Sequence, residues 1–205
     1  MAMQVFPTKG NLIAIKKQLQ LAKLGYELLD RKRNIMLREM LAMAEVAVEL
    51  QEKSNAAFEE AYTLLQYANF TTGQKVVMEI SQMVPVRDHL TIRYKSVMGI
   101  EIPEVVDEEE FMPELNYGIG RTNSYVDKTL IKFNIAKSLA AKQAALENSI
   151  YRLAFAIKQA QKRANALKNI VIPRFDEQII YIQSYLEEKE REEFTAMKMV
   201  KTSKL

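Results

Sequence analysis

The chain has 205 residues, with 29 basic and 26 acidic side chains, a formal net charge of +3 and 48% hydrophobic residues, a composition too apolar for a disordered protein. Six glycines and five prolines are fewer than half of the roughly 25 expected at this length, which excludes a loop-rich β-sandwich and a proline-rich linker. The absence of cysteine excludes disulfides and thiol nucleophiles. No apolar run exceeds five residues, against the roughly 20 that span a bilayer. We therefore expect a soluble, intracellular, mostly helical protein without a membrane span.

Residues 1–70 form the first expected segment, an N-terminal coiled-coil helix. From Leu12 to Ala68 a seam can be followed at alternating steps of three and four residues, and 15 of its 17 positions are apolar or aromatic, which is typical of a coiled coil. The two polar positions are Arg33 and Ser54. The candidate seam residues of this segment are Leu19, Tyr26, Leu29, Met36, Met40 and Met43. The methionines could instead form a pliable binding surface, but their place on the seam favours core packing.

Residues 71–122 have a different pattern, which predicts a small head. Apolar and polar residues alternate on both sides of Gly99, which indicates a β-hairpin over about residues 90–103 that turns at the glycine and stops at Pro103. The candidate hairpin residues are Ile92, Tyr94, Met98, Gly99, Ile100 and Pro103. An acidic run at 107–110 follows, and then a loop that contains Gly118 and Gly120.

Residues 123–205 form the third expected segment, a C-terminal coiled-coil helix. Its candidate seam residues are Ile150, Leu153, Ile157 and Leu167. Beyond Pro173 the seam resumes one residue out of step, at Phe175 and Ile179. Because proline lacks the N–H that a helix needs at that point, the slip predicts a kink or local unwinding.

The charge distribution predicts that the two long helices are antiparallel. Residues 9–33 carry a net charge of +5 and residues 34–70 one of −4, whereas residues 128–174 carry +9 and residues 175–194 carry −5. An antiparallel hairpin sets each block beside one of opposite sign. Each exposed pair contributes only ~0.2–1 kcal/mol, but together the pairs select the orientation. The sequence therefore predicts a mostly α protein, a long antiparallel two-helix coiled coil with a small middle head that contains a β-hairpin.

Three local features could carry chemistry, and each has a simpler interpretation. The glycines at 118 and 120 lack the third glycine and the Lys-Ser/Thr pair of a phosphate-binding loop. The acidic run 107–110 lacks the ligand spacing of a calcium loop, and His89 is the single histidine of the chain. The residues thus indicate a protein that is not an enzyme and has no cofactor, metal or catalytic site.

The basic residues of the two long helices leave alternatives open. They could bind the phosphates of a nucleic acid, dock on a protein, or pair with the interleaved acidic blocks as a solvated face. The net charge of only +3 and the absence of a nucleic-acid-binding motif favour a solvated or pairing face, followed by protein docking.

Several stretches of the chain are distinctive when taken together. They are PTKGNL at 7–12, LLDRKR at 28–33, SVMGIEIP at 96–103, KRANALKNIVIP at 162–173 and LEEKEREEF at 186–194. In this order, and over essentially the whole chain, they resemble the D subunit of the vacuolar- and archaeal-type rotary ATPases. The resemblance implies the central-stalk rotor shaft of a V/A-type ATPase, which transmits torque between the catalytic hexamer and the membrane ion-translocating ring during ATP synthesis or ATP-driven H⁺/Na⁺ transport.

The same resemblance implies partners and a location. The partners would be the catalytic hexamer, the F subunit of the stalk and a funnel-shaped adaptor that links to the membrane ring, and not a nucleic acid. The location would be the cytoplasmic side of the membrane, where the chain is held peripherally through the complex. We expect a hexamer-facing collar made of Arg31, Lys32, Arg33, Lys162, Arg163, Lys168 and Arg174. A homodimeric coiled-coil scaffold and a nucleic-acid-binding helical hairpin remain the alternatives.

Overall fold

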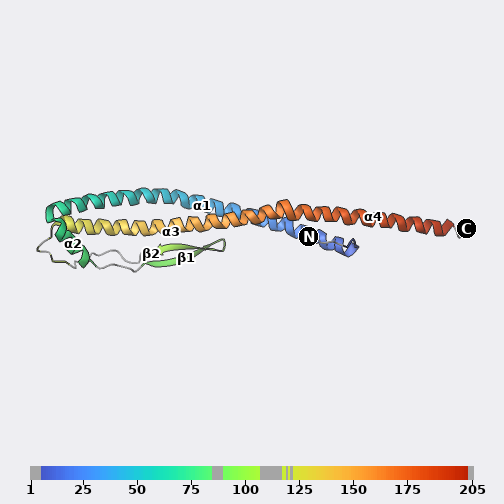
Figure 1. Ribbon diagram of the computed structural model, residues 1–205, viewed down its shortest axis with the longest axis horizontal. Helices are drawn as coiled ribbons and strands as arrows, with labels where there is room; N and C mark the ends of the chain where they lie inside the picture. Colours follow the sequence, from blue (N-terminus) through green and yellow to red (C-terminus); the bar gives the residue numbers. More distant parts are fainter. Residues whose placement is uncertain (1–5, 85–89, 107–116, 119, 121, 203–205) are drawn as a thin grey trace. The chain divides into compact units, whose positions relative to one another are not determined.

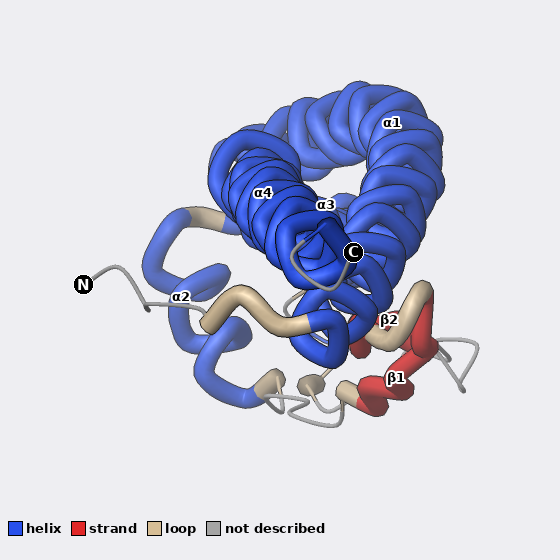
Figure 2. The backbone as a smooth tube through the Cα atoms, turned by 90° about the vertical axis from the view of Figure 1, so that its right-hand side faces the viewer, coloured by secondary structure: helices blue, strands red, loops and turns tan. Residues whose placement is uncertain are grey.

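The computed structural model describes residues 6–84, 90–106, 117–118, 120 and 122–202. His89 and the acidic run 107–110 lie outside these residues. In chain order the elements are α1 (Lys9–Thr72), α2 (Gln74–Met83), β1 (Thr91–Val97), β2 (Ile100–Val106), α3 (Ser124–Ala166), the π-helical turn η2 (Leu167–Val171) and α4 (Ile172–Thr202) (Figure 1). In the described part of the chain, β1 and β2 are the strands and nearly all else is helix (Figure 2). The predicted fold class, two long helices with a β-hairpin between them, is confirmed.

Helix α1 has a specific signal at each end. The side-chain oxygen of Thr8 accepts a hydrogen bond from the N–H of Asn11 at 3.3 Å, which is the usual N-cap arrangement. At the other end Gly73 has a φ of 92°, a conformation that glycine adopts without steric cost, and its N–H donates to the carbonyl of Asn69 at 3.1 Å. The turn at Gly73 therefore ends α1 and starts α2.

The seam of α1 is its covered face. All 17 seam positions from Leu12 to Ala68 are buried or partly buried, including the polar Arg33 and Ser54. The candidate seam residues of the second long helix, Ile150, Leu153, Ile157 and Leu167, are likewise not exposed. Apolar residues at this spacing form a stripe along one side of a helix, and burying that stripe is what holds such helices together.

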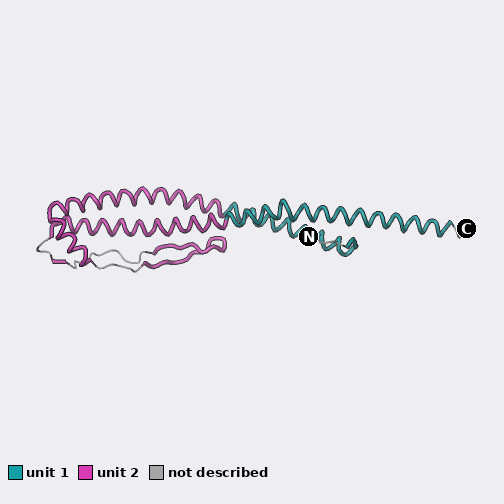
Figure 3. The backbone as a smooth tube through the Cα atoms, viewed as in Figure 1, with its two compact units in different colours: residues 1–35, 157–205 teal, residues 36–156 magenta. Residues whose placement is uncertain are grey.

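The contacts of the chain form two compact units (Figure 3). Unit 1 comprises Met1–Ile35 and Ile157–Leu205, and unit 2 comprises Met36–Ala156. These units divide the chain by contacts, whereas the expected segments 1–70, 71–122 and 123–205 divide it by order along the sequence, so the segment boundaries stay a prediction.

The long helices are antiparallel within each unit. In unit 1 the Lys9 ammonium lies 2.8 Å from the Glu190 carboxylate, so the start of α1 is beside the far part of α4. In unit 2 Lys132 lies 2.6 Å from Glu60. The ring of Tyr67 stacks on that of Tyr125 with centroids 5.7 Å apart. Residue numbers that rise along α1 thus meet numbers that fall along the other helix.

Strands β1 and β2 form the predicted hairpin in unit 2, with one boundary corrected. Met98 and Gly99 have φ values of 52° and 78°, and two positive φ angles identify the two-residue turn whose twist suits a hairpin. The strand does not stop at Pro103 as the sequence suggested, because β2 continues to Val106. Pro103 pairs with Tyr94, in the fourth pair counted from the turn. This is a non-hydrogen-bonded position, where a missing N–H leaves the ladder intact.

The predicted disturbance near Pro173 takes the form of a π-helical turn. Residues Leu167–Val171 form η2, and the N–H of Ile172 donates to the carbonyl of Leu167. A π turn holds one residue more than an α turn, which matches the one-residue slip of the seam. The helix continues on both sides of this turn.

Candidate functional site

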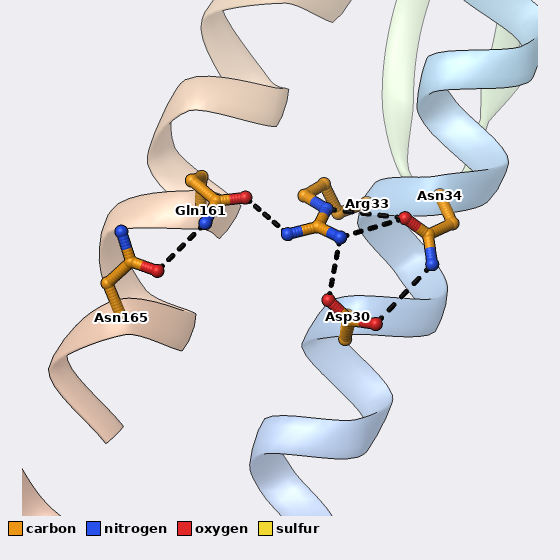
Figure 4. Close-up of polar contacts among 5 residues, drawn as sticks. All are labelled: Asp30, Arg33, Asn34, Gln161 and Asn165. Atoms are coloured by element: carbon orange, nitrogen blue, oxygen red, sulfur yellow. Dashed lines mark hydrogen bonds and ion pairs between the residues drawn. The ribbon is translucent and has the colours of Figure 1, made fainter. Parts of the chain in front are cut away.

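A polar network joins the two helices of unit 1 (Figure 4). The Arg33 guanidinium lies 2.8 Å from Asp30 Oδ1 and donates to Asn34 Oδ1 at 3.0 Å, all within α1. Another of its nitrogens donates across to Gln161 Oε1 on α3, and the Gln161 amide donates to Asn165 Oδ1 at 2.8 Å. Five side chains from two helices are therefore linked through one arginine.

The network identifies the role of the polar seam position. The Arg33 side chain is 27% exposed, whereas that of Arg31 is 77% exposed. A polar group that finds its partners in only one alignment of two helices fixes their register at some cost in stability. Arg33 thus contacts the second helix of its own chain.

The other residues of the expected collar lie on the surface. Six of the seven are exposed, and each lies in unit 1. They are Arg31, Lys32, Lys162, Arg163, Lys168 and Arg174. The ammonium of Lys168 lies 5.9 Å from the centroid of the Tyr26 ring, close enough for a cation–π attraction. The hexamer-facing role of this basic surface stays a prediction.

An ion pair and an apolar cluster hold the far part of unit 1. Ile15, Ile179 and Ile182 form a buried cluster. Beyond it, the hydrogen bond to Glu190 raises the pKa of Lys9, and the same contact lowers the pKa of Glu190. Both side chains are well exposed, at 74% and 60%, so their pair contributes orientation more than stability.

In unit 2 the hairpin docks on α3 through its backbone. The hydroxyl of Ser149 lies 2.7 Å from the carbonyl of Ala145 in its own helix and 3.2 Å from the carbonyl of Pro103. Arg152 donates to the carbonyl of Glu101 at 3.0 Å. Glu101 and Pro103 both occupy non-hydrogen-bonded pairs of the hairpin, so their carbonyls point away from β1. The Arg152 guanidinium also lies 5.9 Å from the Tyr94 ring centroid.

The two strands differ in how far they are covered. Ile102 and Pro103 on β2 are buried, and Ile100 is partly buried. On β1 the Ile92 and Tyr94 side chains are 47% and 60% exposed. Met98 and Gly99 at the turn are exposed as well. The hairpin therefore attaches through β2 and presents β1 and the turn to the surroundings.

A second local site of unit 2 lies where α1, α2 and α3 meet. Ala68, Ile80, Tyr117 and Val126 form a buried cluster. The Tyr117 hydroxyl donates to Asp127 Oδ1 at 2.5 Å, and desolvation together with this bond raises the pKa of Tyr117 to about 12. The phenol is thus held in its neutral, donating form.

The Arg33 network, the docked hairpin and the Tyr117 site hold parts of the chain in place, and the basic residues of unit 1 and strand β1 are exposed surfaces. Among the residues that the structure describes, no three His, Asp or Glu side chains gather as a metal site. Within the same ranges, no helix is both long and apolar enough to cross a membrane.

Sequence reasoning missed the partners that complete these sites. Gln161 and Asn165 each directly follow an alanine of the seam and have no pattern of their own, although Arg33 at a seam position was a signal that some polar partner exists. Ser149 directly precedes the seam residue Ile150 and is only 1% exposed. A small residue beside the seam was the sequence signal for Ser149, and it does not indicate that the hairpin is the partner.

Comparison with known proteins identifies the family. The sequence pattern of the family of ATP synthase D subunits matches residues 11–202. The chain is 46% identical over 199 residues to the D subunit of the V-type ATP synthase of Thermotoga neapolitana, a match that covers 97% of this chain and 98% of the relative. It is 33% identical over 202 residues to the D subunit of the A-type ATP synthase of Desulfurococcus sp., at 97% and 94% coverage. With the predicted fold in place, these matches show that the chain belongs to the family of ATP synthase D subunits.

Proposed function

We propose that this chain is the central-stalk rotor shaft of a V/A-type ATP synthase and transmits torque between the catalytic hexamer and the membrane ring. The observation that carries the proposal is that the coiled coil is made within one chain. All 17 seam positions of α1 are already covered, so a second copy is not needed to bury them. Membership of the D-subunit family supports the same assignment.

The shaft mechanism places two requirements on the chain. Its helices must not slide past each other under load. The Arg33 network of unit 1 and the aromatic contacts of unit 2 oppose such sliding. Its surface must also differ from side to side, so that each position of the shaft stabilises a different state of the surrounding subunits. The chain itself supplies no catalytic group in this proposal, and nucleotide chemistry belongs to the hexamer.

The basic surface of unit 1 is the part that we assign to the hexamer. Exposed lysines and arginines attract acidic surfaces and fix the register of a protein interface. We assign the exposed hairpin edge and the surface around Tyr117 to the other stalk partners, the F subunit and the funnel-shaped adaptor. In this proposal the chain is peripheral, on the cytoplasmic side of the membrane.

One reconstitution tests the proposal against its rivals. The purified chain is mixed with a catalytic hexamer and the stalk's F subunit, and the mixture is run on a sizing column. We expect one co-eluting complex. Dimers that ignore the ATPase subunits would support a scaffold, and salt-dependent retention on RNA or DNA would support a nucleic-acid-binding hairpin. Either result without the complex would contradict the shaft.

Charge reversal tests the collar without disturbing the fold. Arg31→Glu with Lys32→Glu changes two exposed residues, whereas Arg33 is left in place because it belongs to the network. We expect weaker assembly or loss of coupling between ATP hydrolysis and rotation. Arg38→Glu with Lys53→Glu, which reverses two exposed charges on the part of α1 in unit 2, is the matched control. Equal behaviour of the two double variants would exclude the collar.

A further inference from the structure

The seam of the second long helix has two parts that differ in phase. As far as the end of η2 it follows Ala160, Ala164, Leu167 and Val171. Steps of three and four residues would then continue at Arg174, Gln178, Tyr181 and Tyr185. The covered positions are instead Phe175, Ile179, Ile182 and Leu186, each one residue later. One residue corresponds to about 100° of rotation around an α-helix. Without the slip, α4 would present a different face to α1.

Both parts of this seam are held against the same helix, α1. Before η2, Gln161 bonds to Arg33. After η2, Ile179 and Ile182 pack on Ile15. These two sets of contacts cannot form together on one uninterrupted α-helix, because the phase would be wrong on one side. The π turn lies between them and takes up the difference.

The surroundings of η2 allow a turn of this kind. Lys168, Asn169 and Ile170 are exposed, so carbonyls that lose a donor there can bond to water. Pro173 follows two residues after η2 and offers no N–H. A Cβ added to Gly25 on α1 would lie 3.8 Å from Leu167 Cδ1, which is ordinary contact. The π turn is therefore not forced by crowding from α1.

We propose that η2 is a phase-setting turn, a two-position device that holds α4 in the orientation with its isoleucines inward. The second position is the plain α-helical form of residues 167–171. It turns Tyr181 and Tyr185 toward α1 and brings Ile179 and Ile182 out to solvent. In the observed position Tyr181 and Tyr185 are 60% and 46% exposed. The device thus decides which face of α4 any partner meets.

The apolar cluster is what selects the observed position. The four inward residues of α4 are all apolar, while the alternative set contains an arginine and a glutamine. Burial of apolar area favours the first set, and a buried unpaired polar group opposes the second. Pro173 lies two residues beyond the π turn and, in this proposal, is not its cause.

Two single-residue deletions in the whole chain test this proposal. Both are made in a Pro173→Ala background, because a proline inside an uninterrupted helix would destabilise it by itself. Deleting Asn169 removes the extra residue and leaves a continuous seam. We expect its melting temperature to equal or exceed that of Pro173→Ala alone. Deleting Gln159, an exposed residue of α3, is the matched control. It shifts the phase of Gln161 and all later residues relative to the covered residues Leu153 and Ile157, and no extra residue lies there to take up the change, so we expect a clear loss of stability. Equal losses in the two deletions would overturn the proposal.

Disulfide trapping reads the phase directly, since the chain has no cysteine of its own. Ile15→Cys with Ile179→Cys reports the observed position, and Ile15→Cys with Gln178→Cys reports the alternative. We expect fast cross-linking of the first pair and at least tenfold slower cross-linking of the second, with the same preference in the Pro173→Ala background. Equal rates for the two pairs would show that η2 sets no phase. Loss of the preference with Pro173→Ala would assign the phase to the proline.

Discussion

The two units hold their antiparallel helices together with different chemistry. In unit 1 the cross-helix contacts include an arginine network, an exposed ion pair, a cation–π contact of Lys168 with Tyr26 and a small isoleucine cluster in which Ile182 is fully buried. Unit 2 has one exposed cross-helix ion pair, Lys132 with Glu60. It also has aromatic contacts, such as Tyr62 edge-on to Phe133 at 5.3 Å, and fully buried side chains such as Met36 and Leu153. Polar contacts specify alignment, whereas buried apolar area supplies stability. Both units contain contacts of both kinds, but the polar network that specifies register lies in unit 1, and more of the buried apolar side chains lie in unit 2.

The largest expected effect is in the packed core of unit 2. Leu153 is 0% exposed, so Leu153→Ala removes buried atoms and leaves a cavity, which costs about 2–5 kcal/mol. Urea unfolding followed by circular dichroism measures the loss. Phe155→Ala, at a side chain that is 57% exposed on the same helix, is the control and should cost far less. Similar losses for the two variants would contradict the stabilising role of the seam.

The next effect is in the Arg33 network of unit 1. Arg33→Ala removes charge-assisted hydrogen bonds and leaves Asp30 with only the Asn34 amide as its partner, and we expect a loss of about 1–2 kcal/mol. A double-mutant cycle with Gln161→Ala should give a coupling energy of about 0.5–1 kcal/mol. Arg31→Ala, at a 77% exposed side chain, should change stability by no more than about 0.5 kcal/mol. A coupling of zero would mean that the network does not join the helices.

A smaller effect is expected where the hairpin docks. Ser149→Ala removes the hydroxyl beside the Pro103 carbonyl, and we expect a loss of about 1 kcal/mol. The informative measurement is amide hydrogen exchange, which should speed up over Thr91–Val106 more than over α1. Uniform acceleration along the chain would show that Ser149 supports the helix and not the hairpin.

The pH dependence of the unfolding free energy tests the Tyr117 site of unit 2. The folded-state pKa of Tyr117 is raised to about 12 from 10.0, so its contribution to stability is complete below pH 10 and is lost as the pH rises toward 12. Tyr117→Phe should flatten the stability profile in that window. The profile is measured by urea unfolding at several pH values. If wild type and variant declined in parallel, the bond to Asp127 would not be the cause.

The smallest effect belongs to the ion pair of unit 1. The pKa of Glu190 is lowered by Lys9, so the stability that the pair contributes is present above the unfolded carboxylate pKa and fades as the pH falls. Because both groups are exposed, Glu190→Gln should barely shift the thermal melt, and 1 M salt should remove the difference. A large, salt-resistant shift would contradict the division of labour between the units.

Several features of the fold could be predicted because they are properties of short stretches of chain. The three-four spacing predicts the covered face of α1, and the structure covers all of its positions. The Met98–Gly99 turn follows from alternation on both sides of a glycine. Pro103 misled the prediction, because whether a strand tolerates proline depends on which positions of the partner strand it pairs with. That pairing is not visible in β2 alone.

The candidate sites were predicted less completely, for a related reason. Arg33 reads as one of three consecutive basic residues, and only Gln161, 128 residues away, separates its role from that of its neighbours. Ser149 and Arg152 meet backbone carbonyls of the hairpin, which leave no mark in the sequence. Every residue carries a backbone carbonyl, so a contact with one has no signature in the sequence.

Periodicity and charge order are local and additive, so the sequence alone dictated two long helices, their antiparallel direction and a hairpin between them. The one-residue slip before Phe175 was visible in the same way. The tertiary structure decided that a π turn absorbs it, that Arg33 turns inward, and that β2 and not β1 faces α3. Those outcomes depend on which distant groups compete for the same space and the same hydrogen bonds, and only the folded chain brings these groups together.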